Sequence, residues 1–288
     1  MQIASLFQKN RPVLSLEVFP PKKTSPIDII YKTLDNLKDL QPDFISVTYG
    51  AGGNAGDTST ADIASNILHK YGILPLAHLT CVNYTKIEIG QILDSLKEKE
   101  IKNVLALRGD INPDIPPKKE FSYASDLVKY IKDKGDFFIS GACYPEGHLD
   151  AEDIDKDIEH LKLKVEAGAQ HLISQLFFDN SHFYNFIDKT RKAGITVPIQ
   201  AGIMPVINKS QIERMVTLCG ASIPSKFSKM MQRFEHSPEA IKEAGIAYAV
   251  DQIVDLISQG VDGIHLYTMN NPYVARRITE SIKGIILA

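Results

Sequence analysis

The chain has 288 residues, 44% of them hydrophobic and 23% charged, and a formal net charge of -3. These values are typical of a globular protein and argue against a disordered chain or a fibre. They also argue against a broad basic surface for nucleic acid or anionic lipid, so small molecules are the expected partners.

Short apolar runs rich in valine and isoleucine recur along the chain and predict buried β-strands. In chain order the eight runs are VLSLEVF, FISVTY, LPLAHLT, NVLALR, FFISGACY, HLISQLF, PIQAGI and GIHLYT.

Segments with helical spacing alternate with these runs. The clearest is TKIEIGQILDSLKEK, in which Thr85 and Glu88 have the spacing of a capping box. Its apolar positions fall on one helical face; they are Ile89, Ile92, Leu93 and Leu96. The same reasoning predicts helices near 26–40, 58–71, 122–134, 151–167, 181–194, 238–259 and 272–285.

This alternation predicts a parallel sheet covered by helices. Eight strand–helix units in 288 residues favour a single-domain (β/α)8 TIM barrel over 1–288, with extra helical material near 208–236. A doubly wound open sheet is the alternative, because GAGGNA at 50–55 fits the G-x-G-x-x-A pattern. The next strand ends in HLT, without an acidic residue for a ribose, so we interpret 50–55 as a flexible glycine-rich loop.

The cysteines and histidines lack the spacings of disulfide or metal sites. Cys81, Cys143 and Cys219 are odd in number and form no CxxC pair, which fits a reducing cytoplasm. The N-terminus lacks the apolar core of a signal peptide, and no apolar run approaches membrane-spanning length. No HxH or HExxH pattern occurs, so a metal-dependent hydrolase is disfavoured. A His78–Cys81 catalytic pair is conceivable, but neighbours on a buried strand usually only pack together.

Polar residues gather where the predicted strands end, which is where barrel enzymes place their chemistry. Those ends carry Glu17, Thr48, Tyr49, His78, Thr80, Arg108, Gly109, Asp110, Tyr144, Glu146, Gln175 and Tyr267. Glu17 lies between an apolar strand and Phe19-Pro20-Pro21, so we expect a rigid carboxyl in a partly dry pocket, with its pKa raised by desolvation.

Two further patterns suggest ligand binding. LRGD joins a fixed cation, a glycine and an acid at one strand end, which suits an anionic or heteroaromatic ligand; an Arg–Asp pair within a turn is the alternative. In the helix at 151–167 a polar stripe flanks the apolar face, although such stripes are usually just solvated. The stripe comprises Asp153, Asp157, His160 and Lys164.

Taken together in chain order, these motifs resemble the methylenetetrahydrofolate reductase family from about Ser15 to Tyr267. The segments are LEVFPPK, SVTYGAGG, HLTC, LALRGD, YASDL, YPEGH, KVEAGA, SQLFFD, GIMPV and HLYTMN. The resemblance implies a (β/α)8 barrel that holds FAD over the strand ends. It also implies a ping-pong cycle in which NADH or NADPH reduces the flavin and leaves, and 5,10-methylenetetrahydrofolate then accepts the hydride to give methyltetrahydrofolate for methionine synthesis.

The same resemblance implies residue roles. Glu17 matches the general acid that opens the methylene bridge to an iminium, and Asp110 matches the acid beside flavin and folate. The substrate-binding positions are Gln175, Gln200 and Tyr267. The flavin positions are Thr48, Tyr49, His78, Arg108, Gly109, Asp110, Ala124, Tyr144, His148, Asp157, His160 and Lys164.

Two positions depart from the family pattern. Asn271 stands where an arginine commonly binds substrate, and we expect Arg276 or Arg277 to compensate. Leu163 stands where some members place a basic residue near the flavin. The short segment after the last strand predicts a catalytic domain without the regulatory domain of eukaryotic members, and we expect a homo-oligomer. Two alternatives stay open: another FAD-dependent barrel oxidoreductase resembling proline dehydrogenase, and a non-catalytic partner subunit.

Overall fold

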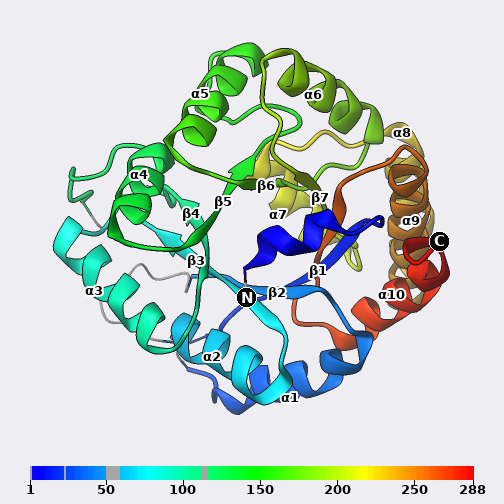
Figure 1. Ribbon diagram of the computed structural model, residues 1–288. Coiled ribbons are helices and arrows are strands. Elements are labelled where there is room, and N and C mark those ends of the chain that lie inside the picture. Colours follow the sequence, from blue (N-terminus) through cyan, green and yellow to red (C-terminus); the bar gives the residue numbers. More distant parts are fainter. Residues whose placement is uncertain (1, 23, 50–58, 112–115) are drawn as a thin grey trace.

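The computed structural model describes residues 2–22, 24–49, 59–111 and 116–288, and its strands form a closed parallel barrel in the order β1 to β8 (Figure 1). The strands are β1 (Val13–Val18), β2 (Phe44–Val47), β3 (Leu74–Thr80), β4 (Asn103–Leu107), β5 (Phe138–Cys143), β6 (His171–Ser174), β7 (Ile199–Ile203) and β8 (Gly263–Tyr267). The predicted (β/α)8 barrel is confirmed, and the open-sheet alternative is wrong because β1 pairs with β8. GAGGNA at 50–55 lies outside the described residues.

Helices surround the barrel and alternate with its strands (Figure 1). They are α1 (Asp28–Leu37), α2 (Ser59–Tyr71), α3 (Lys86–Glu98), α4 (Ala124–Lys134), α5 (Ile154–Ala167), α6 (Asn180–Lys192), α9 (Pro238–Ser258) and α10 (Pro272–Ile286). The capping box of α3 is confirmed: Glu88 N–H donates to Thr85 Oγ1 at 3.2 Å, and Thr85 N–H donates to Glu88 Oε2 at 2.7 Å. No described helix has the length and apolar character to cross a membrane.

One end of the barrel is closed by the chain's own N-terminus. The short 3₁₀ helix η1 (Ile3–Gln8) lies across the barrel axis in Figure 1. Its Ile3 and Leu6 pack with Phe44 and Phe138, and Ile3 N–H donates to Asn103 Oδ1 at 2.9 Å. The carboxyl ends of the strands lie at the opposite end of the barrel.

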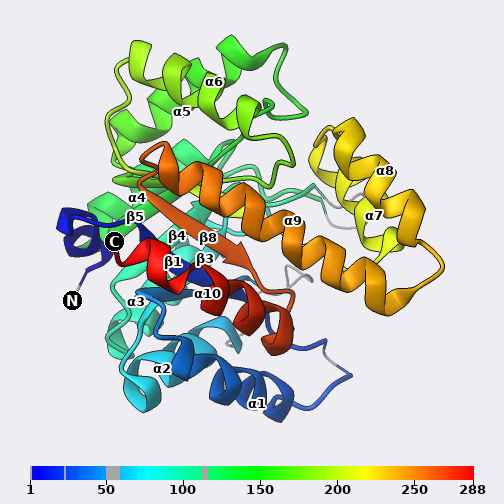
Figure 2. The ribbon, with the colours of Figure 1, turned by 90° about the vertical axis from the view of Figure 1, so that its right-hand side faces the viewer.

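The extra helical material predicted between the last two strands is present as α7 (Lys209–Cys219) and α8 (Ser225–Phe234). Figure 2 shows both helices beyond the end of the barrel toward which β8 points. Phe227 of α8 stacks on Phe178 and meets Tyr248 of α9 edge-on, both at 4.8 Å between ring centroids. This packing places α7 beside the open end of the barrel.

Candidate active site

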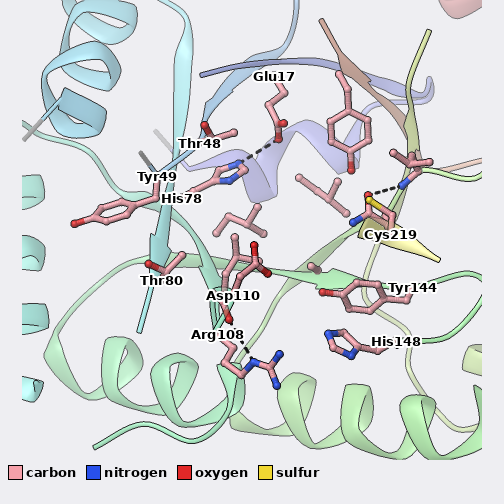
Figure 3. A pocket seen from close by; sticks show the side chains of 18 of the residues that line it. Glu17, Thr48, Tyr49, His78, Thr80, Arg108, Asp110, Tyr144, His148 and Cys219 are labelled. Atoms are coloured by element: carbon pink, nitrogen blue, oxygen red, sulfur yellow. Dashed lines mark hydrogen bonds and ion pairs between the residues drawn. The ribbon is translucent and has the colours of Figure 1, made fainter. Parts of the chain in front are cut away.

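A cavity of about 590 Å³ opens at the carboxyl ends of the strands. This volume is within the range of small-molecule sites, and the location is the one where barrel enzymes bind substrate. The predicted site residues that line it are Glu17, Thr48, Tyr49, His78, Arg108, Gly109, Asp110, Tyr144, His148, Gln175 and Tyr267 (Figure 3). Residues that were predicted to lie at the ends of different strands, and that are far apart in the sequence, therefore line the same cavity.

Glu17 lies near the end of β1 with its side chain 15% exposed. Its Oε2 lies 3.4 Å from His265 Nε2, 3.5 Å from His78 Nε2 and 3.5 Å from Ser46 Oγ. Burial raises the pKa of the carboxyl, but hydrogen bonds from His265 and Ser46 and the electrostatic influence of both histidines outweigh it. The pKa therefore lies below its usual value. The expectation of a raised pKa is wrong, because three other strands supply neighbours that stabilise the carboxylate.

A chain of hydrogen bonds leads from the barrel interior to Glu17. Gln200 Nε2 donates to Ser15 Oγ at 3.2 Å, and Ser15 Oγ lies 2.6 Å from His265 Nδ1. Because an ionised carboxylate can only accept, the tautomer that suits Glu17 has the proton on His265 Nε2, and Nδ1 then accepts from Ser15 Oγ. The structure thus adds Ser15 and His265 to the site.

Gln200 does not lie where it was expected. Its side chain is fully buried inside the barrel and donates to the carbonyls of Val13 and Ile264 at 3.1 and 3.2 Å. Gln200 lies outside the cavity lining, so it is not placed to contact a substrate there. It is instead the first donor of the hydrogen-bond chain that leads to Glu17.

His78 lies beside Glu17, and Figure 3 shows the two side chains pointing toward one another. Burial lowers the pKa of His78 to about 4, so the ring is neutral near pH 7. Its Nε2 is buried and makes no hydrogen bond within the described part of the chain. Its charged neighbour is Glu17, whose Oε2 lies 3.5 Å away.

The LRGD turn presents its charges separately rather than as an internal pair. Arg108 Nη2 lies 2.8 Å from Asp150 Oδ2, while Asp110 lines the cavity as an exposed side chain. Gly109 has a φ of 86°, and a Cβ there would lie 3.0 Å from Thr80 Cβ. A side chain at this position would therefore be both strained and crowded, which explains the glycine between the two charges.

The α5 stripe supports the cavity wall from behind. The Tyr144 and His148 rings meet edge-on at 4.6 Å, and His148 N–H donates to Asp157 Oδ2 at 3.2 Å. Lys164 Nζ donates to the Ala142 carbonyl at 2.6 Å. Burial raises the pKa of Asp157 and lowers that of Lys164, as expected for charged groups taken out of water.

Some predicted flavin positions lie outside the cavity lining. Asp157 and Lys164 lie behind the wall, Ala124 is the first residue of α4, and His160 is exposed on α5. Leu163, the departure on the same helix, is 56% exposed.

Asn271 and its expected substitutes also lie away from the cavity. Asn271 is the N-cap of α10, with Oδ1 accepting from Val274 N–H at 3.2 Å. Arg276 binds Asp39 at 2.8 Å, and Arg277 binds Glu243 at 3.0 Å. The expectation that either arginine replaces the missing one is therefore wrong in this structure, because both are engaged on the outer side of α10.

Helix α7 contributes Met215 and Cys219 to the cavity, and neither residue was predicted from the sequence. The segment after α7 is held by Glu146, whose carboxylate oxygens accept from Ser222 N–H at 3.2 and 3.1 Å. Ser222 Oγ is 3.2 Å from His182 Nε2. Glu146, predicted only as a strand-end residue, therefore fastens this wall of the cavity.

The geometry argues against a thiol nucleophile. Burial raises the pKa of Cys81 to about 12, and its Sγ points to the carbonyls of Arg108 and Tyr123. The pKa of Cys219 is also raised by burial. Among the residues that the structure describes, no group of His, Cys, Asp and Glu has an arrangement that could hold a metal ion.

Comparison with known proteins agrees with the earlier resemblance. The family model described as methylenetetrahydrofolate reductase matches residues 2–283. A 5,10-methylenetetrahydrofolate reductase of Pectobacterium carotovorum is 35% identical over 269 residues, covering 93% of this chain and 89% of the relative. That of Escherichia coli K12 is 35% identical, with 93% and 90% covered. The chain spans only half of methylenetetrahydrofolate reductase (NADH) 1 of Arabidopsis thaliana, at 34% identity over 99% of the chain.

Solved structures share the architecture. A Clostridium thermocellum protein that binds two copies of 5-methyl-5,6,7,8-tetrahydrofolic acid superimposes with a TM-score of 0.68 at 14% identity, covering 100% of this chain and 99% of that one. A dihydropteroate synthase of Coxiella burnetii, in complex with pteroic acid, gives 0.55 at 9% identity, covering 96% and 93%. At such identities the likeness concerns the fold alone.

Proposed function

Because this chain belongs to the methylenetetrahydrofolate reductase family, whose members are oxidoreductases, we propose that it reduces 5,10-methylenetetrahydrofolate to 5-methyltetrahydrofolate with FAD and NADH or NADPH. The observation that carries this proposal is a cavity with the Glu17–His265 pair on one side and the Arg108–Asp110 turn with Tyr144 and His148 on the other. The product would supply methyl groups for methionine synthesis.

The residues present fit a flavin. His78 lines the cavity beside Glu17, and Arg108 supplies a fixed cation at the rim, on the turn that Gly109 permits. Tyr144 and His148 add an aromatic wall, and Lys164 adds a cation behind it. When bound, FAD would take a hydride from the nicotinamide and pass it to the folate in a ping-pong cycle.

Glu17 would donate its proton to one nitrogen of the methylene bridge, so that the bond from this nitrogen to the bridging carbon breaks and an iminium forms with the other nitrogen. With the neighbours that the structure shows, its carboxyl is ionised at neutral pH, because its pKa is lowered. Burial is nonetheless the largest single influence on that pKa and acts upward. A ligand that displaces the remaining water from this side chain therefore moves the pKa toward neutrality, where a protonated fraction becomes available. After proton transfer, the Nε2–H of His265 would stabilise the carboxylate.

Gln175 and Tyr267 would contact the folate, since both line the cavity and Tyr267 is the partner of Glu17 in the β1–β8 ladder. The Tyr267 hydroxyl already donates to the Ser174 carbonyl at 2.7 Å. Tyr267 would therefore contribute the face of its ring rather than its hydroxyl. A cytoplasmic location and a homo-oligomeric state remain part of this proposal.

Anaerobic stopped-flow of the FAD-loaded protein tests the proposed function. Flavin absorbance should bleach with NADH or NADPH and recover with 5,10-methylenetetrahydrofolate. If the flavin does not recover with 5,10-methylenetetrahydrofolate but the protein turns over proline, the protein is instead a proline dehydrogenase-like oxidase. A preparation that cannot be loaded with FAD would indicate a non-catalytic subunit.

The double substitution Lys164→Ala/Arg108→Ala should weaken FAD binding about tenfold or more. A charge-assisted hydrogen bond from Arg108 at the rim would be worth about 1.5–3 kcal/mol, and each 1.4 kcal/mol is about tenfold in the dissociation constant. Lys164 lies behind the wall and would contribute through its charge alone. Titration of apoprotein with FAD, followed by flavin fluorescence, measures the constant. The matched control is Lys162→Ala/Arg276→Ala, which removes two cations outside the cavity. Equal FAD affinity in the two double variants would refute the assignment.

Asp110→Asn should raise the midpoint potential of the bound flavin and slow the folate half-reaction. A carboxylate near the ring disfavours added negative charge, so its neutralisation favours reduction. We expect a shift on the order of 30 mV, the value of a tenfold change for a two-electron couple. Spectroelectrochemical titration measures it, with Asp150→Asn as a comparison at the rim. An unaltered potential would place Asp110 away from the ring.

A further inference from the structure

The β-ladder that carries Glu17 ends immediately beyond it. Glu17 pairs with Tyr267 as the last residue of the β1–β8 register. The next residue, Val18, still pairs with Val47 of β2 but has no partner on the β8 side, and Phe19 and Pro20-Pro21 follow the end of β1. A proline has no backbone N–H to donate. On the β8 side, the backbone that carries the Glu17 carboxyl therefore lies at the end of its ladder.

Two side chains of the loop between β8 and α10 replace the missing ladder. Thr268 Oγ1 donates to the Glu17 carbonyl at 2.6 Å. Asn270 binds both backbone groups of Phe19: its Oδ1 accepts from the N–H at 3.1 Å, and its Nδ2 donates to the carbonyl at 2.8 Å. Asn270 N–H also donates to Thr268 Oγ1 at 3.1 Å, which joins the two contacts into one unit.

This arrangement is maintained against the intrinsic preference of the backbone. Met269 and Asn270 both have a φ of 51°, in the left-handed region. Asparagine tolerates that region, whereas methionine does not favour it. Strained residues persist where the surrounding structure over-determines them, and they concentrate at functional sites. Here the strain turns the Asn270 amide back toward β1.

We infer that Thr268 and Asn270 form a clasp that positions Glu17 for proton transfer to the folate, an inference that rests on the proposed function of Glu17. The clasp fixes the backbone on both sides of Val18, so the carboxyl keeps its direction while the cavity fills and empties. Neither residue lines the cavity. They are thus positioning residues that act through Glu17, and their loss should affect only the step that uses its proton.

The test compares four variants of the full-length, FAD-loaded protein. Thr268→Val removes the hydroxyl but keeps the branched shape, and Thr268→Ser keeps the hydroxyl. Asn270→Gly permits the same backbone while removing the amide. Thr85→Val is the matched control, because it breaks the cap of α3 at a residue outside the cavity lining. Anaerobic stopped-flow measures the two half-reactions, hydrogen exchange reports the Phe19 amide, and thermal unfolding reports stability.

Thr268→Val and Asn270→Gly should slow flavin reoxidation by 5,10-methylenetetrahydrofolate roughly 10- to 100-fold, as expected for a small misplacement of a reacting group. Bleaching by the nicotinamide should stay near the wild-type rate, and Thr268→Ser should restore reoxidation. Thr85→Val should lower the unfolding midpoint and leave both half-reactions intact. The Phe19 amide should exchange faster in Asn270→Gly than in the wild type.

The inference is overturned if Thr268→Val and Asn270→Gly reoxidise normally. It is also overturned if both half-reactions fall in step with the unfolding midpoint, as a purely structural role requires. A wild type that bleaches with nicotinamide but never recovers with folate refutes the proposed function instead. In that case the exchange rate of the Phe19 amide decides whether the clasp exists, and equal rates in Asn270→Gly and wild type reject it.

Discussion

Glu17→Gln should slow flavin reoxidation by 5,10-methylenetetrahydrofolate about 10²–10⁴-fold, the usual contribution of a positioned general acid. Glutamine keeps the size and the hydrogen-bonding reach of the side chain but has no proton to give. Bleaching of the flavin by NADH or NADPH should stay near the normal rate, because a direct hydride transfer to the flavin needs no proton from Glu17. The two rates are measured separately by anaerobic stopped-flow.

The size of this effect depends on the surroundings of Glu17. His265, His78 and Ser46 all lie within 3.5 Å of Oε2, so the carboxyl is held in one place before the folate arrives. Glu100→Gln is the matched control, since the Glu100 side chain is 74% exposed outside the cavity. A parallel fall of both half-reactions would make Glu17 structural. Normal reoxidation would mean that the acid lies elsewhere.

The fold was predictable because two periodicities alternate along the chain. Apolar runs such as NVLALR and PIQAGI became strands buried on both faces, and the segment from Lys86 to Glu98 became a helix with the predicted cap. The strand-end rule then located the cavity, because in a closed parallel barrel all carboxyl ends meet on one face.

The neighbours of Glu17 were not predictable in the same way. Ser15 pairs with His265 only because β1 and β8 close the barrel, and the two residues are 250 positions apart. The sequence shows both as single polar residues within apolar runs, which is usually a sign of a satisfied core group. When the pairing of β1 with β8 is unknown, only the effect of burial on the pKa of Glu17 can be considered. Burial alone predicts a raised pKa, whereas the pKa in the structure is lowered. Met215 and Cys219 were not predicted for a different reason. They lie on α7, a helix inserted between β7 and β8, whereas the prediction considered only residues at the ends of strands.

Acidification should destabilise this protein well before its carboxylates are protonated, because two histidines are buried in the neutral form. Burial lowers the pKa of His78 to about 4 and that of His171 to about 3. His171 lies near the closed end of the barrel among Phe7, Phe44 and Phe138, with Nδ1 3.0 Å from Ser140 Oγ. Its Nε2 is buried without a hydrogen bond in the described part of the chain.

The sign follows from proton binding. Between pH 6.5 and these lowered pKa values the unfolded chain binds a proton at each histidine and the folded chain does not, so the free energy of unfolding falls as the pH falls. At 1.36 kcal/mol per pKa unit, each histidine removes about 2 kcal/mol between pH 7 and pH 5. Glu17 acts in the same direction, but only as the pH falls through and below its ordinary value near 4.5, so the window from pH 7 to 5 isolates the histidines.

Urea unfolding of wild type and His171→Asn at pH 7 and pH 5 tests this expectation. Asparagine places an amide near the Nδ1 position, so it keeps a partner for Ser140 while it removes the ionisable ring. The variant should be less stable than wild type at pH 7, because the smaller side chain leaves space between the phenyl rings. Its loss of stability from pH 7 to pH 5 should nevertheless be about 2 kcal/mol smaller than that of wild type. His236→Asn, at a ring 94% exposed, is the control and should retain the full loss. If the free energy of unfolding of His171→Asn falls from pH 7 to pH 5 as much as that of wild type, then His171 binds its proton in the folded protein. The acid sensitivity must then come from other groups.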